Sequence, residues 1–139
     1  MKLETSKKIY ISESSIPNAG RGVFAKQGIA KDETIELCPV IRVPLDDSSN
    51  KKGAVLVDYF FYFGDRLAVC LGFGSIYNHS YEPNATYNKD LKTDTVEFKA
   101  LRDINRGEEI IVNYNYGKAN DKTAVFQSEV PPYKKSDKK

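Results

Sequence analysis

Tryptophan is absent from the 139-residue chain, and histidine and methionine each occur only once. The two cysteines, Cys38 and Cys70, are too few for a disulfide framework, and with His79 they cannot supply the four ligands of a structural zinc site. No apolar run approaches the roughly 18 residues that a membrane-spanning helix needs. These scarcities argue against a disulfide scaffold, a metal site and a membrane partner.

A strong excess of one charge is also missing, because the net charge is only +2. So small a value gives no electrostatic sign of a nucleic-acid partner, and we expect no direct one. The first ten residues lack the apolar stretch of a secretory signal, and two cysteines without a leader fit a reducing compartment. We therefore expect an intracellular protein.

The residues that are present favour one domain that is mostly β. Hydrophobic residues make up 40% of the chain and charged residues 29%, a balance typical of a globular domain. Val96, Phe98 and Ala100 alternate with Glu97 and Lys99, which is the pattern of a half-buried strand. No stretch follows a helical period for more than one or two turns.

Turn and breaker residues divide the rest of the chain into short strands. Residues 55–63 and 66–71 flank a glycine turn and are expected to form a hairpin. Residues 33–43 are rich in β-branched side chains, but Pro39 is expected to interrupt them. Residues 46–53 read as a polar loop. Further strands are expected at residues 8–11, 23–26, 96–100 and 109–114.

Gly20, Arg21 and Gly22 form the first group with functional potential. Two glycines two positions apart let a backbone approach a ligand closely or take positive φ. The group is not a dinucleotide-binding fingerprint, because the third glycine and the following helix are missing. On its own it also fits a tight turn that leads into a strand.

Residues 74–87, GSIYNHSYEPNATY, gather hydrogen-bonding side chains where the hydrophobic pattern predicts an interior. His79 follows Asn78 there, and Pro83 precedes Asn84. Three readings stay open from these residues alone: a structural core histidine, a nucleophile pair with one of the cysteines, and a simple asparagine–proline turn. A site that holds a polar ligand is the fourth.

Residues 107–117, GEEIIVNYNYG, form the third group. In an extended strand Val112, Tyr114 and Tyr116 share one face, so two phenols would project together. The alternative is an aromatic edge of the core whose hydroxyls reach water.

The order and spacing of the three groups are more specific than any one group. GRGVFA, YNHSYEPNA and GEEIIVNYNYG together resemble the SET-domain family of protein-lysine methyltransferases. The resemblance covers about residues 9–117. It is closest to the minimal SET proteins, which include small viral histone methyltransferases and carry a similar GFGSIYNHS run.

The resemblance implies a SET (β-clip) fold of short sheets with few short helices. Its C-terminal segment would thread beneath the strand that carries Asn78 and form a pseudoknot, and such threading is rare. Residues 1–117 would be the SET domain. Residues 118–139 would be a C-terminal segment that packs over the site, with its last residues disordered.

The resemblance also implies a site for S-adenosylmethionine. The Asn78 side chain and the His79 backbone would hold the cofactor. Gly20, Arg21 and Gly22 would run along its methionine end.

By the same resemblance Tyr114 would be the catalytic tyrosine, and Tyr116, Tyr87 and Cys38 would line the channel that admits the substrate lysine. Many relatives carry a tyrosine where Cys38 stands. The smaller cysteine is therefore expected to leave room for di- or trimethylation of the amine.

The chemistry asks for an aromatic site of this kind. The amine must be neutral to attack, and the free pKa of lysine is about 10.4, so deprotonation at pH 7 costs roughly 4.6 kcal/mol. A narrow aromatic channel disfavours the ammonium, and alignment of donor and acceptor supplies several kcal/mol more. Neither task needs a metal.

The partner implied by the resemblance is a protein that presents a lysine, for which a histone tail is one candidate. The protein would then lie in the nucleus or on chromatin if its source is eukaryotic or viral, and in the cytoplasm if bacterial. The aromatic run at 55–63 predicts a possible homodimer interface. Two alternatives stay open: a SET-type module that binds a lysine-bearing tail without turnover, and a small β-rich interaction protein.

Overall fold

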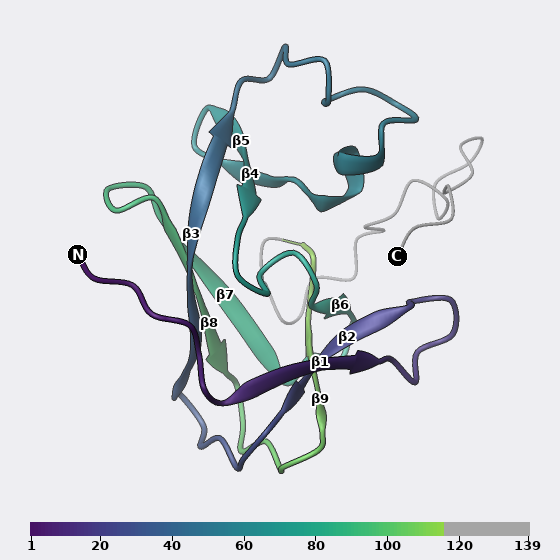
Figure 1. Ribbon diagram of the computed structural model, residues 1–139, viewed down its shortest axis with the longest axis vertical. Helices are drawn as coiled ribbons and strands as arrows, with labels where there is room; N and C mark the ends of the chain where they lie inside the picture. Colours follow the sequence, from purple (N-terminus) through teal and green to yellow (C-terminus); the bar gives the residue numbers. More distant parts are fainter. Residues whose placement is uncertain (116–139) are drawn as a thin grey trace.

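The computed structural model describes residues 1–115, which form two β-sheets (Figure 1). The first sheet has the strand order β1-β2-β9-β6, and the second has the order β4-β5-β3-β8-β7. The strands are β1 (Ile9–Glu13), β2 (Arg21–Ala25), β3 (Thr34–Val43), β4 (Phe61–Phe63), β5 (Arg66–Cys70), β6 (Asn78–His79), β7 (Ala85–Asp90), β8 (Thr95–Ala100) and β9 (Glu109–Val112).

The mostly β fold class predicted from the sequence is confirmed. In β8 the side chains of Val96, Phe98 and Ala100 are buried, as their alternation predicts. The sequence does not predict β7, because its residues ATYNKD are mostly polar and its apolar content is low. The strand forms because it pairs with β8 along its whole length and buries Ala85 and Tyr87.

The interruption expected at Pro39 is wrong, since β3 runs without a break from Thr34 to Val43. Residues 34–39 pair with β8, whereas residues 40–43 pair with β5. The missing N–H of the proline therefore falls where the strand changes partners. That is a position at which a central strand can tolerate proline.

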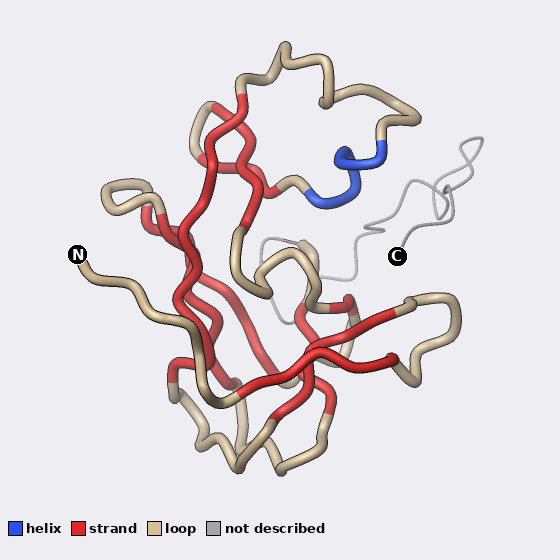
Figure 2. The backbone as a smooth tube through the Cα atoms, in the orientation of Figure 1, coloured by secondary structure: helices blue, strands red, loops and turns tan. Residues whose placement is uncertain are grey.

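The hairpin expected from residue 55 onward is shorter than predicted. Residues 55–59 form a 3₁₀ helix, η1 (Val55–Tyr59), the blue segment in Figure 2, and only Phe61–Phe63 pair with β5. The pairing of β4 with β5 ends at Phe61 and Ala68 although β5 runs on to Cys70, and among the described residues no strand pairs with residues 55–59. A lone 3₁₀ turn satisfies their backbone locally instead.

Strand β9 lies at the centre of the arrangement that builds the site. It pairs antiparallel with β2 and parallel with β6. The Asn84 side chain also clamps it: Oδ1 accepts from the N–H of Ile111 at 2.9 Å, and Nδ2 donates to the carbonyl of Glu109 at 2.8 Å. Just beyond β9, the N–H of Tyr114 donates to Nδ1 of His79 at 3.0 Å, so the chain leaves β9 in contact with β6.

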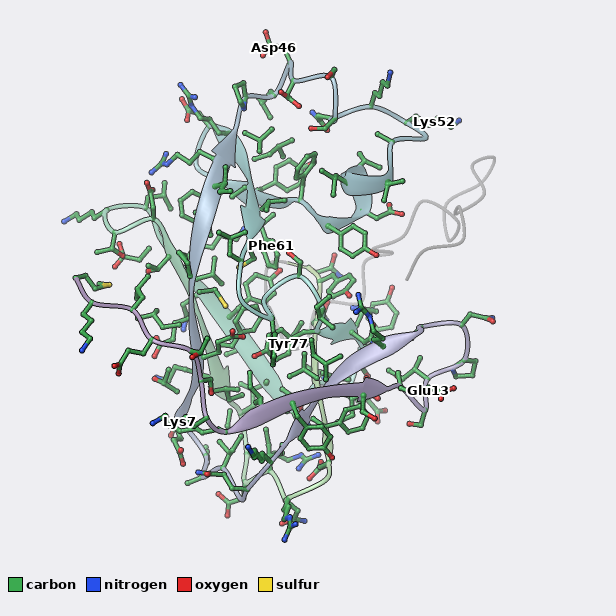
Figure 3. All side chains as sticks on the ribbon, viewed as in Figure 1. Lys7, Glu13, Asp46, Lys52, Phe61 and Tyr77 are labelled. Atoms are coloured by element: carbon green, nitrogen blue, oxygen red, sulfur yellow. The ribbon has the colours of Figure 1, made fainter. Side chains whose placement is uncertain are left out.

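The core lies between the sheets and includes the ring of Tyr77, which is 2% exposed. That ring stacks on Phe98 with 4.1 Å between centroids. Figure 3 shows Tyr77 and Phe61 near the centre of the molecule, whereas Asp46 and Lys52 mark the outer loop between β3 and η1.

Residues 1–115 show neither a membrane-spanning helix nor a metal-binding cluster. No helix within residues 1–115 has the length and apolar character required to cross a membrane. The same residues contain no group of three or more histidine, cysteine or acidic side chains placed to hold a metal ion.

Candidate active site

Asn78 is 3% exposed, and its surroundings fix which way its amide points. Nδ2 lies 2.9 Å from the carbonyl oxygen of Arg21 and 3.0 Å from Oε2 of Glu109. A carbonyl and a carboxylate can only accept, so both N–H groups of Asn78 donate to them. Its oxygen consequently points away from both of these acceptors.

Glu109 completes this corner of the site, and the sequence analysis does not single it out. Ser14 Oγ donates to its carboxylate, 2.9 Å from each oxygen. Gly22 packs directly against it: a Cβ on Gly22 would lie 2.3 Å from Glu109 Oε2 and 3.0 Å from Asn78 Nδ2. No local sequence signal identifies it, because its partner Asn78 lies 31 positions away in the chain.

Gly20 and Arg21 precede this corner on the chain. Gly20 has φ of +75°, which supports the interpretation that the position needs glycine. Arg21 contributes its carbonyl to Asn78, while the residue itself is exposed. Both residues line an open hollow of about 660 Å³ within the β1–β2 loop, of which Asn78 and His79 are not part.

Tyr114 lies beside Asn78, because its hydroxyl donates to the carbonyl of Tyr77 at 2.6 Å. Tyr77 directly precedes Asn78 in the chain. Burial raises the pKa of the Tyr114 hydroxyl, and the nearby Tyr59 raises it further. The hydroxyl therefore stays protonated at neutral pH and does not act as a phenolate base.

Tyr77 is itself anchored at its far end. Its hydroxyl donates to Oε1 of Glu36 at 2.8 Å, and the N–H of Phe73 donates to Oε2 of the same carboxylate at 2.9 Å. Burial and the Glu36 charge raise the pKa of the Tyr77 hydroxyl. The carbonyl that receives the Tyr114 hydroxyl thus belongs to a residue whose ring is held by both stacking and a hydrogen bond.

His79 contacts Tyr114 rather than a catalytic cysteine. Its Nδ1 accepts from the Tyr114 N–H, and the two rings lie 5.2 Å apart between centroids. Accepting at Nδ1 requires that this nitrogen carry no proton. The side chain therefore orients the tyrosine segment, while the cofactor contact of the His79 backbone stays a prediction.

Tyr87 brings a second phenol to the same place. It is 5% exposed, and its hydroxyl donates to the carbonyl of Tyr114 at 3.2 Å. Phe61 meets its ring edge-on, 5.1 Å away at 83°. Tyr59 and Asp58 reach this region from η1, since both act on the Tyr114 hydroxyl electrostatically. The sequence pattern predicts a hairpin at these η1 residues, so they were not among the predicted site residues.

Cys38 belongs to the same buried core cluster as Tyr77 and Tyr87. It is fully buried, and its Sγ would be 3.0 Å from a Cβ on Gly74 and 3.7 Å from one on Gly72. Its hydrogen bond with Cys70 and its burial raise the pKa of the Cys38 thiol, which makes it a poor nucleophile. A channel role for Cys38 stays a prediction.

Cys38→Tyr is expected to lower stability rather than simply alter the product. Two glycines leave no space for a phenol, and overpacking of this kind costs roughly 1–3 kcal/mol or more. Thermal melting of this variant beside Cys38→Ala is the measurement. If Cys38→Tyr melts like the wild type and its product masses shift toward monomethyl-lysine, the predicted role of Cys38 in the lysine channel would be supported.

Tyr116 and residues 118–139 lie outside the described residues. The predicted place of Tyr116 in the channel, and the predicted packing of the C-terminal segment over the site, therefore stay predictions.

The Tyr114 phenol, the Asn78 amide and Gly22 thus lie close together where β9 passes β6. The sequence profile of the SET domain matches residues 20–115, which is more than half of the chain. The chain belongs to the SET domain family.

Two curated relatives carry related activities in their names. A histone-lysine N-methyltransferase specific for H3 lysine-37, from Schizosaccharomyces pombe, is 31% identical over 97 residues, which are 68% of this chain and 66% of the relative. The histone-lysine N-methyltransferase SETD7 of Halocynthia roretzi is 25% identical over 145 residues, 94% of this chain and 37% of the relative. The chain thus spans less than two thirds of either relative.

Solved structures agree on the fold. A candidate histone methyltransferase of Plasmodium falciparum is 31% identical, with a TM-score of 0.63 over 84% of this chain and 98% of that one. A Polycomb Repressive Complex 2 structure bound to S-adenosylmethionine has a TM-score of 0.65 at 21% identity, over 81% of this chain and 16% of that chain. The second likeness supports the fold alone.

Proposed function

We propose that the chain is an S-adenosylmethionine-dependent protein-lysine N-methyltransferase that acts on a histone tail or another lysine-rich segment. One observation carries the proposal above the others: the Tyr114 hydroxyl lies 2.6 Å from the carbonyl of Tyr77, the residue before Asn78. A phenol suited to orienting an amine therefore lies beside an amide suited to holding the cofactor. A histone substrate would place the enzyme on chromatin.

The residues around Asn78 fit the cofactor. Its amide oxygen can accept from the cofactor's ammonium group, and the Glu109 carboxylate supplies negative charge near a ligand that carries two positive groups. Gly22 leaves no room for a side chain at the same corner, so ligand and backbone can approach closely. When bound, S-adenosylmethionine would supply a methyl group on a positively charged sulfur.

The aromatic residues would favour the neutral form of the substrate lysine. Tyr87, Tyr114 and Phe61 present mostly ring surface in a buried region, and burial disfavours an ammonium more than an amine. Asp58 at the η1 side could attract the charged lysine before it enters. The proton would then be lost to water as the side chain passes into the channel.

Tyr114 would orient the amine rather than take its proton. Its hydroxyl hydrogen is committed to the Tyr77 carbonyl, so the oxygen's lone pairs remain to accept an N–H from the amine. With its pKa raised, the phenol keeps that hydrogen at neutral pH. Orientation of the nitrogen lone pair is the main task left in an in-line transfer.

The test is incubation with isotope-labelled S-adenosylmethionine and separate panels of core histones, ribosomal proteins and the chain alone, followed by mass spectrometry. Label on a lysine of one panel is the expected result, and the panel identifies the substrate class. The Tyr114→Phe variant is the matched control. Cofactor binding without label in any panel would favour the binding module, and no cofactor binding would favour the interaction protein.

We also propose a homodimer through η1 and β4. Val55 is 79% exposed and Tyr62 is 59% exposed, which is unusual for an apolar run on a monomer. Light scattering at tens of micromolar is expected to give twice the mass of one chain for the wild type. The Leu56→Glu variant is expected to give the mass of a single chain. Tyr10→Glu, on the other sheet, is the matched control that should stay dimeric. A wild-type chain of single mass would reject this interface.

A further inference from the structure

We propose that Glu109 is a positioning residue of the cofactor site, which holds the Asn78 amide so that its oxygen faces the ligand. This inference rests on the proposed function. It assigns a role to a carboxylate that lies on β9, away from the asparagine–histidine motif in the sequence.

The two hydrogen-bond acceptors around Asn78 Nδ2 fix the orientation of the amide. Asn78 Nδ2 has two hydrogens and two protein acceptors, the Arg21 carbonyl and Glu109 Oε2. An amide could otherwise rotate by half a turn and exchange its oxygen and nitrogen. Rotation here would bring the Asn78 oxygen against two acceptors, so one orientation is selected. Of the two acceptors, only Glu109 is a side chain that evolution or mutagenesis can change.

The Glu109 carboxylate lies between the segments that form the predicted cofactor site. Glu109 joins three separate segments: the β1–β2 loop through Ser14, the β2 backbone at Gly22, and β6 through Asn78. All but Ser14 of these partners were predicted from the sequence to hold the cofactor. A side chain that only stabilised β9 would not need to contact each of them.

The neighbouring Glu108 provides the contrast. Its carboxylate pairs with Arg102 and accepts from the N–H of Asn105, at the turn before β9. It also accepts a long hydrogen bond from Asn84 Nδ2 at 3.4 Å, but no contact with Asn78, Ser14 or Gly22 is found for it among the described residues. Glu108 variants therefore report how far a lost glutamate on this segment changes stability alone.

The first experiment uses the protein without cofactor. Side-chain amide signals of Asn78 are followed by NMR in the wild type, Glu109→Gln and Glu109→Met. We expect the Asn78 Nδ2 protons to exchange with water roughly tenfold faster in Glu109→Met, because one acceptor is lost. Glu109→Gln, whose amide oxygen can still accept, should stay near the wild type. Unchanged exchange in Glu109→Met would overturn the proposal.

The second experiment measures affinity by calorimetry for two probes, S-adenosylmethionine and 5′-methylthioadenosine, which lacks the amino-acid end. Glu109→Met should weaken S-adenosylmethionine roughly tenfold or more and leave methylthioadenosine nearly unchanged. Glu109→Gln should recover most of the loss, and Glu108→Met should show none. In the Asn78→Ala background, Glu109→Met should add little, because the two residues act as a unit.

Three outcomes of the second experiment would contradict the assignment. Equal weakening of both probes would show a merely structural role. A Glu109→Gln loss as large as that of Glu109→Met would show that charge, and not orientation, is what counts. Full additivity with Asn78→Ala would separate the two residues. A wild type that binds neither probe would instead refute the proposed function, while the exchange measurement would still decide whether Glu109 orients Asn78.

Discussion

Tyr114→Phe is expected to lower turnover at least tenfold, about 1.4 kcal/mol in activation free energy, while the affinity for S-adenosylmethionine stays within a factor of about two. The substitution removes one oxygen and keeps the ring, so packing against His79 is retained. What is lost is the hydroxyl on the Tyr77 carbonyl, the atom placed to orient the amine.

Single-turnover kinetics with a lysine peptide, together with calorimetry for the cofactor, separate these two effects. Tyr10→Phe is the matched control, because Tyr10 is exposed and lies on β1, outside both the site and the proposed dimer interface. If Tyr114→Phe keeps full turnover, the Tyr114 hydroxyl has no role in methyl transfer. If only the cofactor affinity falls, the hydroxyl acts in cofactor binding instead.

The sequence predicted the parts of the site that depend on short motifs. The glycine turn, the asparagine–histidine segment and the tyrosine strand each combine residue types with strong local preferences, and their order is distinctive. β2, β8 and β9 were predicted within a few residues, because alternation and flanking turns define a strand locally. The short motifs and the strand patterns are both defined by residues that are neighbours in the chain.

The parts that could not be predicted depend on residues that are distant in the chain. Glu109 reads as a surface glutamate until the fold brings Asn78 against it from 31 positions away. Glu36 reads the same way until Tyr77 reaches it from 41 positions away. Likewise, Pro39 reads as a strand breaker unless the change of partner from β8 to β5 is known. No local pattern encodes these pairings.

Asn78→Asp is expected to have the largest effect of any single substitution at the site. It changes one nitrogen to oxygen, but that oxygen would face the Arg21 carbonyl and the Glu109 carboxylate at about the present 2.9 Å and 3.0 Å. Three acceptors without a hydrogen between them cost roughly 2–4 kcal/mol when buried. At this chain length that corresponds to a fall in Tm on the order of 7–14 °C. Cofactor binding should be lost as well.

The loss should also depend on pH, with a sign that the geometry dictates. Two carboxylates in contact share a proton, so the pKa of the pair that the introduced carboxylate forms with Glu109 would lie above the free value of about 4. The folded variant then binds a proton that the unfolded chain releases, and its stability falls as the pH rises through that raised pKa. The gap in Tm between variant and wild type should therefore be smaller at about pH 5 than at about pH 8. Gln27→Glu makes the same change from amide to carboxylate at an exposed position after β2 and should show no such gap. If Asn78→Asp melts with the wild type at the higher pH and still binds the cofactor, then the amide does not face these acceptors as described.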